Sequence, residues 1–113
     1  MPDAFHPWRM NAEKSYMAQA LEQAELAAAR GEVPVGAVLV DPAIGEVIAA
    51  DGNRTREYDD PTAHAEMLVI RAGAGAKGKE RLNGFDLYVT LEPCPMCAQA
   101  ISFARLRRLY FAA

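Results

Sequence analysis

The sequence predicts an α/β fold in which helices cover a central β-sheet. Helical and strand patterns alternate along the chain, and residues 34–40 form an almost wholly apolar, β-branched run typical of a strand buried on both faces. The chain has 113 residues, of which 51% are hydrophobic, and a net charge of −3. These values are typical of one soluble globular domain.

The N-terminal third predicts a tail followed by a helix. Residues 1–10 contain two prolines and mixed aromatic residues without a period, so we expect a disordered tail before a domain spanning residues 11–113. Asn11 is a suitable N-cap, and Gly31 is a suitable end for the helix that follows. Helical spacing relates the apolar positions Met17, Ala20, Leu21, Ala24, Ala27 and Ala28.

The rest of the chain predicts a hairpin and then alternating helices and strands. A turn at 41–45 lets residues 46–50 return as the antiparallel partner of the first strand. A helix at 63–72, which Thr62 could cap, should fray where Gly73, Gly75 and Gly78 follow. Three later elements are expected: a strand at 85–91, a helix at 95–104 packed through Ala98, Ile101 and Phe103, and a strand beginning at 109–111.

Cys94 and Cys97 are the only two cysteines, and Pro95 between them suits the first turn of a helix that would place both sulfurs on one face. A redox dithiol, a structural zinc site and a catalytic zinc site all use such a pair. A structural site needs four protein ligands, yet His64 is the one plausible further ligand, because His6 lies in the predicted tail. A redox pair would need a thioredoxin-like setting. Catalytic zinc held by His64, Cys94 and Cys97 is therefore favoured.

Glu66 lies two residues after His64, an offset that places a helical side chain beside a metal rather than on it. Zinc in such a site lowers the pKa of a water molecule toward about 7, and a nearby carboxylate can transfer its proton as a general acid/base. The alternative is a surface glutamate favoured by the dipole of the first helical turn. The joint occurrence of His-x-Glu and Pro-Cys-x-x-Cys favours the catalytic role.

This combination is a signature of zinc-dependent nucleobase deaminases. From about residue 12 to its end the chain resembles bacterial tRNA-specific adenosine deaminases, within the cytidine/deoxycytidylate deaminase superfamily. The matching segments are EVPVGAVLV at 32–40, GNR at 52–54, DPTAHAE at 60–66 and LYVTLEPCPMC at 87–97. The resemblance implies a cytidine-deaminase-like three-layer α/β/α fold with a mixed central sheet and one Zn²⁺ per chain.

The resemblance further implies hydrolytic deamination of adenosine to inosine in RNA at the wobble position, with a tRNA anticodon loop as partner, a homodimer and Glu66 as catalytic residue. Asn53 can donate to and accept from a purine edge, although it equally suits a turn after Gly52; the resemblance favours substrate contact. Two alternatives remain: a deaminase of a free base or nucleoside, guanine or cytosine, and an inactive zinc-binding fragment.

Composition adds two expectations about context. No apolar run approaches the roughly 20 residues of a membrane span, and no apolar signal segment begins the chain, so we expect a cytoplasmic protein without a membrane partner. The acidic balance gives no general support for nucleic-acid binding, so the tRNA expectation rests on resemblance.

Family members continue with a further strand and C-terminal helices. We therefore expect a C-terminally incomplete domain, in which Leu109, Tyr110 and Phe111 form an apolar edge open to self-association or to a missing fragment.

Overall fold

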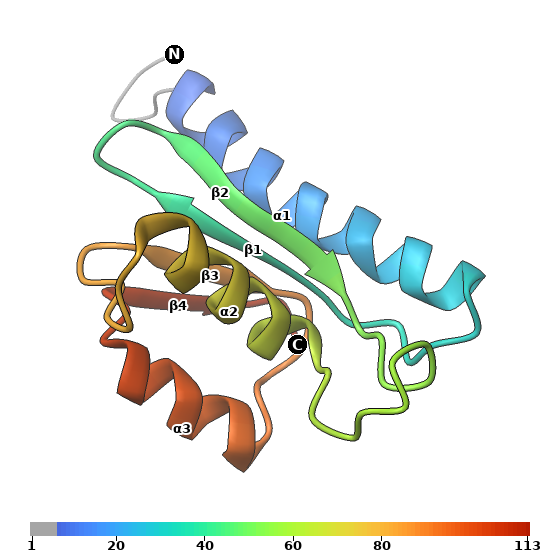
Figure 1. The fold of residues 1–113 in the computed structure, drawn as a ribbon. Coiled ribbons are helices and arrows are strands. Elements are labelled where there is room, and N and C mark those ends of the chain that lie inside the picture. Colours follow the sequence, from blue (N-terminus) through green and yellow to red (C-terminus); the bar gives the residue numbers. More distant parts are fainter. Residues whose placement is uncertain (1–6) are drawn as a thin grey trace.

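The computed structural model describes residues 7–113, with side chains from Tyr16 onward. Helices and strands alternate as the sequence predicts (Figure 1). Their order is α1 (Pro7–Ala29), β1 (Gly36–Asp41), β2 (Glu46–Gly52), α2 (Ala65–Lys77), β3 (Asp86–Val89), α3 (Pro95–Ala104) and β4 (Arg108–Phe111).

The strands form one mixed sheet in the order β2-β1-β3-β4. β1 pairs antiparallel with both neighbours, so that Val38 lies opposite Ala50 on one side and Tyr88 on the other. β3 and β4 are parallel, and α3 makes the crossover between them. β1 is an interior strand whose two faces both contribute to hydrophobic clusters, which explains why its sequence is almost wholly apolar.

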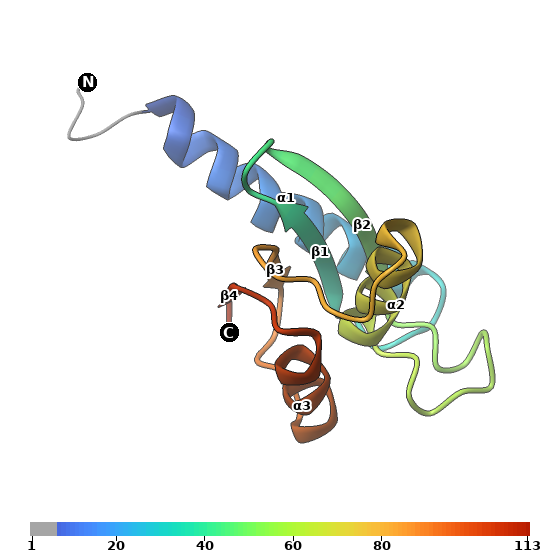
Figure 2. The same cartoon turned by 60° about the vertical axis from the view of Figure 1, so that its left-hand side comes forward.

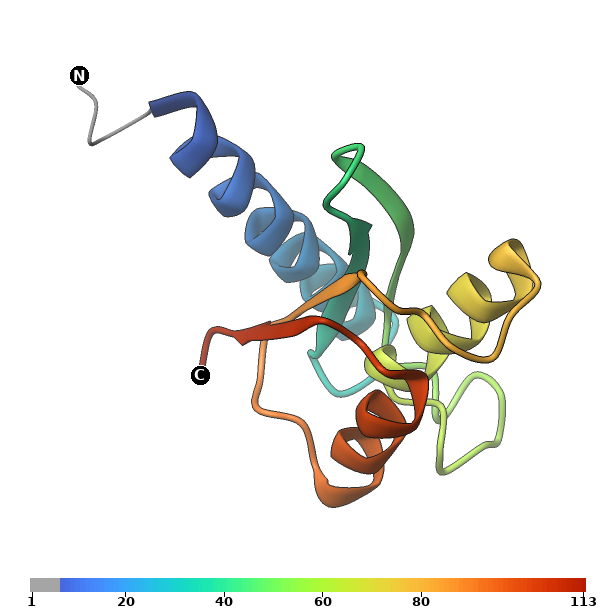
Figure 3. The same ribbon diagram turned by 90° about the vertical axis from the view of Figure 1, so that its left-hand side faces the viewer.

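Three layers result, because α1 covers one face of the sheet while α2 and α3 cover the other (Figures 2 and 3). Side chains alternate along β1: Val38 and Val40 pack in one cluster with Ala20 of α1, whereas Ala37 and Leu39 pack in the cluster that includes α2. The predicted three-layer α/β/α architecture with a mixed sheet is confirmed.

Helix α1 begins at Pro7, four residues before the predicted N-cap Asn11. Pro7 suits a first helical turn because its fixed φ is helical and its missing N–H would have no intrahelical acceptor there. The predicted tail is therefore wrong for residues 7–10, and its remaining part, residues 1–6, lies outside the described residues.

The inner face of α1 is made of alanines. Ala20, Ala24 and Ala27 are buried as predicted, whereas Leu21 is 48% exposed. Such small side chains let the helix lie close to β1, where a Cβ on Gly36 would overlap the carbonyl oxygen of Ala20. Gly36 therefore lies directly against the backbone of α1.

The prediction that the second helix frays after residue 72 is wrong. Helix α2 continues through Gly73 and Gly75 to Lys77, and Gly78 ends it in the left-handed conformation with φ 66°. Gly73 is buried against the sheet, and a Cβ there would overlap a methyl group of Leu39. Gly73 therefore allows α2 to pack closely against Leu39 of β1, a contact that intrinsic helix propensity does not predict.

Helix α3 has the predicted bounds, but its predicted inner face is partly wrong. Phe103 is 68% exposed and Ala98 is also exposed, whereas Cys97 and Ala104 are buried and Ile101 is half-buried. These inner positions are spaced i, i+4, i+7, so the helix turns the face that contains Cys97 toward the core. Within residues 7–113, no helix is long and apolar enough to cross a membrane.

Candidate metal centre and its cavity

His64 and Cys94 occupy equivalent positions, the N-caps of α2 and α3. Both have extended backbone dihedrals, and neither makes a side-chain cap hydrogen bond, so their side chains are available to a ligand. Pro95 follows Cys94 at the start of α3 as predicted, and Cys97 lies within its first turn. Two helix N-termini, each favouring negative charge, therefore meet at this point.

These three side chains form a compact donor group. His64 Nδ1 lies 3.7 Å from Cys94 Sγ and 3.5 Å from Cys97 Sγ, and all three donor atoms lie within 4.8 Å of one another. A tetrahedral zinc ion with Zn–S of about 2.3 Å and Zn–N of about 2.05 Å would separate nitrogen from sulfur by about 3.6 Å. The observed spacing and the nitrogen-sulfur donor set fit zinc.

The electrostatics of the group also fit a cation. Burial raises the pKa of the Cys97 thiol, and the neighbouring carboxylate of Glu66 raises it further. Without a cation, the Cys97 thiol therefore resists ionisation. A metal ion reverses this preference, because a coordinating thiol is deprotonated by the ion's charge.

Glu66 is buried beside the donor group, with 4% of its surface exposed. Burial raises the pKa of its carboxyl, while its own backbone N–H, the charge of His64 and a hydrogen bond with Cys97 act in the opposite direction. The first turn of α2 therefore brings His64 and Glu66 to one site. A solvated surface glutamate, the alternative considered above, does not describe this residue.

Asn53 is also buried at the site, with 6% of its surface exposed. Its Oδ1 accepts a hydrogen bond of 2.8 Å from the backbone N–H of Ala65, the first residue of α2. Asn53 thereby satisfies a free donor of the helix terminus, a role that Thr62 was predicted to take. Thr62 instead donates its hydroxyl to Asp60. Within residues 16–113, the Asn53 side-chain nitrogen makes no hydrogen bond.

A cavity of about 240 Å³ opens at this point. Its lining combines four predicted site residues with four that the sequence analysis did not single out, Val33, Val35, Leu91 and Glu92. The full lining is Val33, Val35, Asn53, His64, Glu66, Leu91, Glu92 and Cys94. Val33 and Leu91 are 57% and 49% exposed. Both lie in the segments EVPVGAVLV and LYVTLEPCPMC that carry the family resemblance, which is the signal that could have found them.

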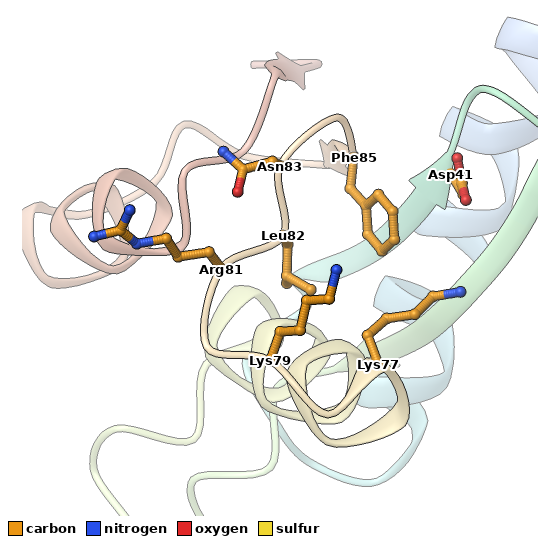
Figure 4. A pocket seen from close by; sticks show the side chains of 7 residues that line it. All are labelled: Asp41, Lys77, Lys79, Arg81, Leu82, Asn83 and Phe85. Atoms are coloured by element: carbon orange, nitrogen blue, oxygen red, sulfur yellow. The ribbon is translucent and has the colours of Figure 1, made fainter.

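A second cavity of about 260 Å³ lies at the other end of α2 (Figure 4). Lys77, Lys79 and Arg81 line it together with Asp41 and Phe85, and the Lys77 ammonium lies 5.5 Å from the centre of the Phe85 ring. Thirteen helical residues separate it from His64, which corresponds to about 20 Å at 1.5 Å per residue. It shares no lining residue with the metal centre.

The three-layer fold, the nitrogen-sulfur donor group at two helix N-termini and the buried carboxylate together define a zinc-site domain of the nucleobase deaminase class. Residues 10–113 match the family model of the cytidine and deoxycytidylate deaminase zinc-binding region. The chain belongs to this family, and the predicted resemblance is confirmed.

Two curated relatives are tRNA-specific adenosine deaminases. The one from Agrobacterium fabrum is 63% identical over 98 residues and the one from Bacillus subtilis is 47% identical over 104 residues, which are 87% and 92% of this chain. The chain spans 63% of the length of each of these relatives.

Two solved structures share the fold, each with a TM-score of 0.84. One, from a study of A-to-I editing by tRNA:A34 deaminases at the wobble position of transfer RNA, is 62% identical, and the match covers 88% of this chain and 75% of that one. The other, guanine deaminase from Bacillus subtilis, is 37% identical, and the match covers 88% of this chain and 63% of that one.

Proposed function

We propose that this chain carries the catalytic centre of a zinc-dependent hydrolase that deaminates adenosine to inosine in the anticodon loop of a tRNA. One observation supports the chemistry above all others: the buried carboxylate of Glu66 lies beside a nitrogen-sulfur donor group at the wall of a cavity. Identity of 63% to a tRNA-specific adenosine deaminase supports the substrate.

The proposed roles follow from position. His64, Cys94 and Cys97 would hold one zinc ion per chain, and zinc, when bound, supplies an activated water molecule. Glu66 would take one proton of this water and deliver it to the purine ring nitrogen, and would then take the second proton and deliver it to the leaving amine, which restores the carboxylate. Addition of water at C6 and loss of ammonia convert adenosine to inosine. The rigid first turn of α2 keeps Glu66 at a fixed offset from His64.

The cavity supports a single nucleobase as the reacting group. Val33, Val35 and Leu91 offer apolar surface for a base, and the Asn53 side-chain nitrogen can donate to an acceptor on the purine edge. A base reaches such a cavity only when it is unstacked, and a single-stranded loop presents an unstacked base without the free energy of opening a duplex. An anticodon loop meets this requirement.

The remaining proposals concern context. We infer a cytoplasmic protein, since tRNA is its proposed substrate. We also propose a homodimer, because Leu109 and Phe111 on β4, an edge strand of the described sheet, are 37% and 48% exposed. Sedimentation of the zinc-loaded protein tests the dimer, and a monomer across the micromolar range would contradict it.

The activity is tested with zinc-loaded protein and an RNA hairpin whose loop contains one adenosine, in parallel with free guanine and free cytosine. Mass spectrometry of the products should detect inosine in the RNA. Glu66→Gln should retain the zinc content and lower turnover by about 10²–10⁴-fold, the usual contribution of a general acid/base. Glu80→Gln is a matched control, since Glu80 is exposed and lines neither cavity.

Each other outcome has a definite meaning. Deamination of guanine without inosine in RNA would favour the guanine deaminase activity named for the structure that is 37% identical. Zinc binding without any product would identify the inactive fragment. Equal turnover by Glu66→Gln and the wild type would remove Glu66 from the mechanism.

A further inference from the structure

Glu32 is a buried carboxylate outside the donor group. It lies between α1 and β1, and 6% of its surface is exposed. One carboxylate oxygen, Oε1, accepts the backbone N–H of Arg56 at 3.1 Å and the hydroxyl of Thr55 at 3.4 Å, and Oε2 accepts the backbone N–H of Glu57 at 2.8 Å. Two consecutive backbone N–H groups converging on one carboxylate form an anion-binding arrangement within the fold.

These hydrogen bonds require a carboxylate rather than a neutral group. Burial alone would raise the pKa of Glu32, but the backbone N–H groups of Arg56 and Glu57, the Thr55 hydroxyl and the charge of Arg30 lower it below the ordinary 4.5. Glu32 is therefore ionised at neutral pH. Replacing the carboxylate with a neutral amide would leave one of these two backbone donors without its acceptor.

Asn53 also joins the segment that contains Glu32 to the segment that leads to α2. The Arg30 guanidinium donates to the Asn53 carbonyl oxygen at 3.1 Å, and the Asn53 backbone N–H donates to the Val35 carbonyl oxygen at 3.1 Å. Beyond Asn53, the Arg54 backbone N–H donates to the Ala63 carbonyl oxygen at 3.0 Å. Asn53 therefore lies between the 55–57 segment, fixed by Glu32, and the start of α2.

The Arg54 side chain also contacts the 55–57 segment, which it joins to the end of β2. Its guanidinium donates to Asp51 at 2.8 Å and to Glu57 at 2.6 Å. The Arg54–Asp51 contact is partly buried and the Arg54–Glu57 contact is exposed, and both join residues only three apart in sequence. The Glu32 contacts join residues 23 to 25 apart, so they fix the segment to the rest of the domain.

We propose that Glu32 is a positioning residue for the nucleobase site, whose carboxylate fixes residues 55–57 so that Asn53 is held at the cavity beside His64. It acts through Asn53 and touches no substrate. The expected effect of Glu32 on KM rests on the proposed deaminase function, whereas its expected effect on the structure of residues 53–57 does not.

The test compares zinc-loaded Glu32→Gln with wild type and with Glu46→Gln, an exposed glutamate at the start of β2. Glutamine keeps the size of the side chain but replaces one acceptor oxygen with an amide nitrogen, which faces an N–H group. Amide exchange of Arg56 and Glu57 should accelerate about tenfold or more, and the NMR resonances of the Asn53 side-chain amide should shift. Glu46→Gln should change neither.

The kinetic measurement uses the adenosine-containing hairpin. For Glu32→Gln we expect the KM to rise about tenfold while kcat and zinc content stay near wild type, because a misplaced Asn53 weakens binding of the base and leaves the donor group intact. Glu32→Asp, which retains the charge, should recover part of the loss.

Unchanged exchange and an unchanged Asn53 resonance would overturn the proposal, as would a loss of zinc in parallel with the loss of activity, which would indicate a general structural role. If wild type deaminates no RNA, the proposed function fails separately, and the exchange and resonance measurements still decide whether Glu32 positions Asn53.

Discussion

The replacement Gly36→Ala tests the contact between α1 and the sheet. A Cβ at this position would overlap the Ala20 carbonyl oxygen, lie 2.5 Å from the Ala24 backbone nitrogen and lie 2.9 Å from Gln23 Cβ. These separations are far inside the optimal carbon contact of about 3.5–4.0 Å. Because β1 is hydrogen-bonded to a strand on each side, it cannot move away, and α1 must shift instead.

The expected loss is at the upper end of the range for overpacked cores, about 3 kcal/mol of unfolding free energy. With an m-value of about 1.5 kcal/mol/M in urea, the unfolding midpoint should fall by about 2 M. Urea titration followed by circular dichroism measures this change, at one saturating zinc concentration for all variants because bound zinc adds to stability.

Gly75→Ala is the matched control. A Cβ on Gly75 would meet nothing within 4 Å, and the residue is exposed within α2. Alanine should therefore stabilise the protein by about 0.5–1 kcal/mol, the usual gain over glycine inside a helix. If Gly36→Ala unfolds at the same urea concentration as wild type, α1 does not approach β1 as closely as described, and the reasoning is refuted.

Two further predictions concern charged groups. Arg107 donates to both oxygens of Asp86, which is 2% exposed, so Arg107→Gln should lower the unfolding free energy, and the double variant with Asp86→Asn should recover part of this loss in urea titrations. Hydrogen bonds from the Thr62 hydroxyl and, second, from the Thr62 backbone N–H lower the pKa of Asp60 below 3.8. This shift stabilises the folded state at pH values above 3.8, and the stabilisation disappears as the pH falls through the pKa that Asp60 has in the folded state. Asp60→Asn should therefore be less stable than wild type near pH 7, and the two unfolding free energies should converge as the pH falls; a difference that stays constant as the pH falls below 3.8 would contradict the assignment.

Local sequence was sufficient to predict the types of the elements and the donor group. Cys94 and Cys97 share a face because they are three residues apart at the start of a helix, and His64 and Glu66 are related by one short offset at the start of another. Such relations depend on backbone geometry within a few residues, so they can be inferred before the fold is known.

The glycines of α2 show where local reasoning fails. Gly73 lowers intrinsic helix propensity, but packing against Leu39 outweighs that preference. The inner face of α3 was mispredicted for a similar reason, since hydrophobicity alone does not tell which apolar side of a short helix the sheet covers, and Phe103 is left exposed.

By itself, the sequence predicted the candidate metal ligands and the carboxylate beside them, because two short motifs contain all four residues. The tertiary structure alone decided how the cavity is built. Asn53 reaches the N–H of Ala65 across 12 residues, and Glu32 reaches residues 55–57 across at least 23. Contacts over such separations exist only after the segments have packed together, because no local pattern specifies which buried donor a distant carboxylate or amide will meet.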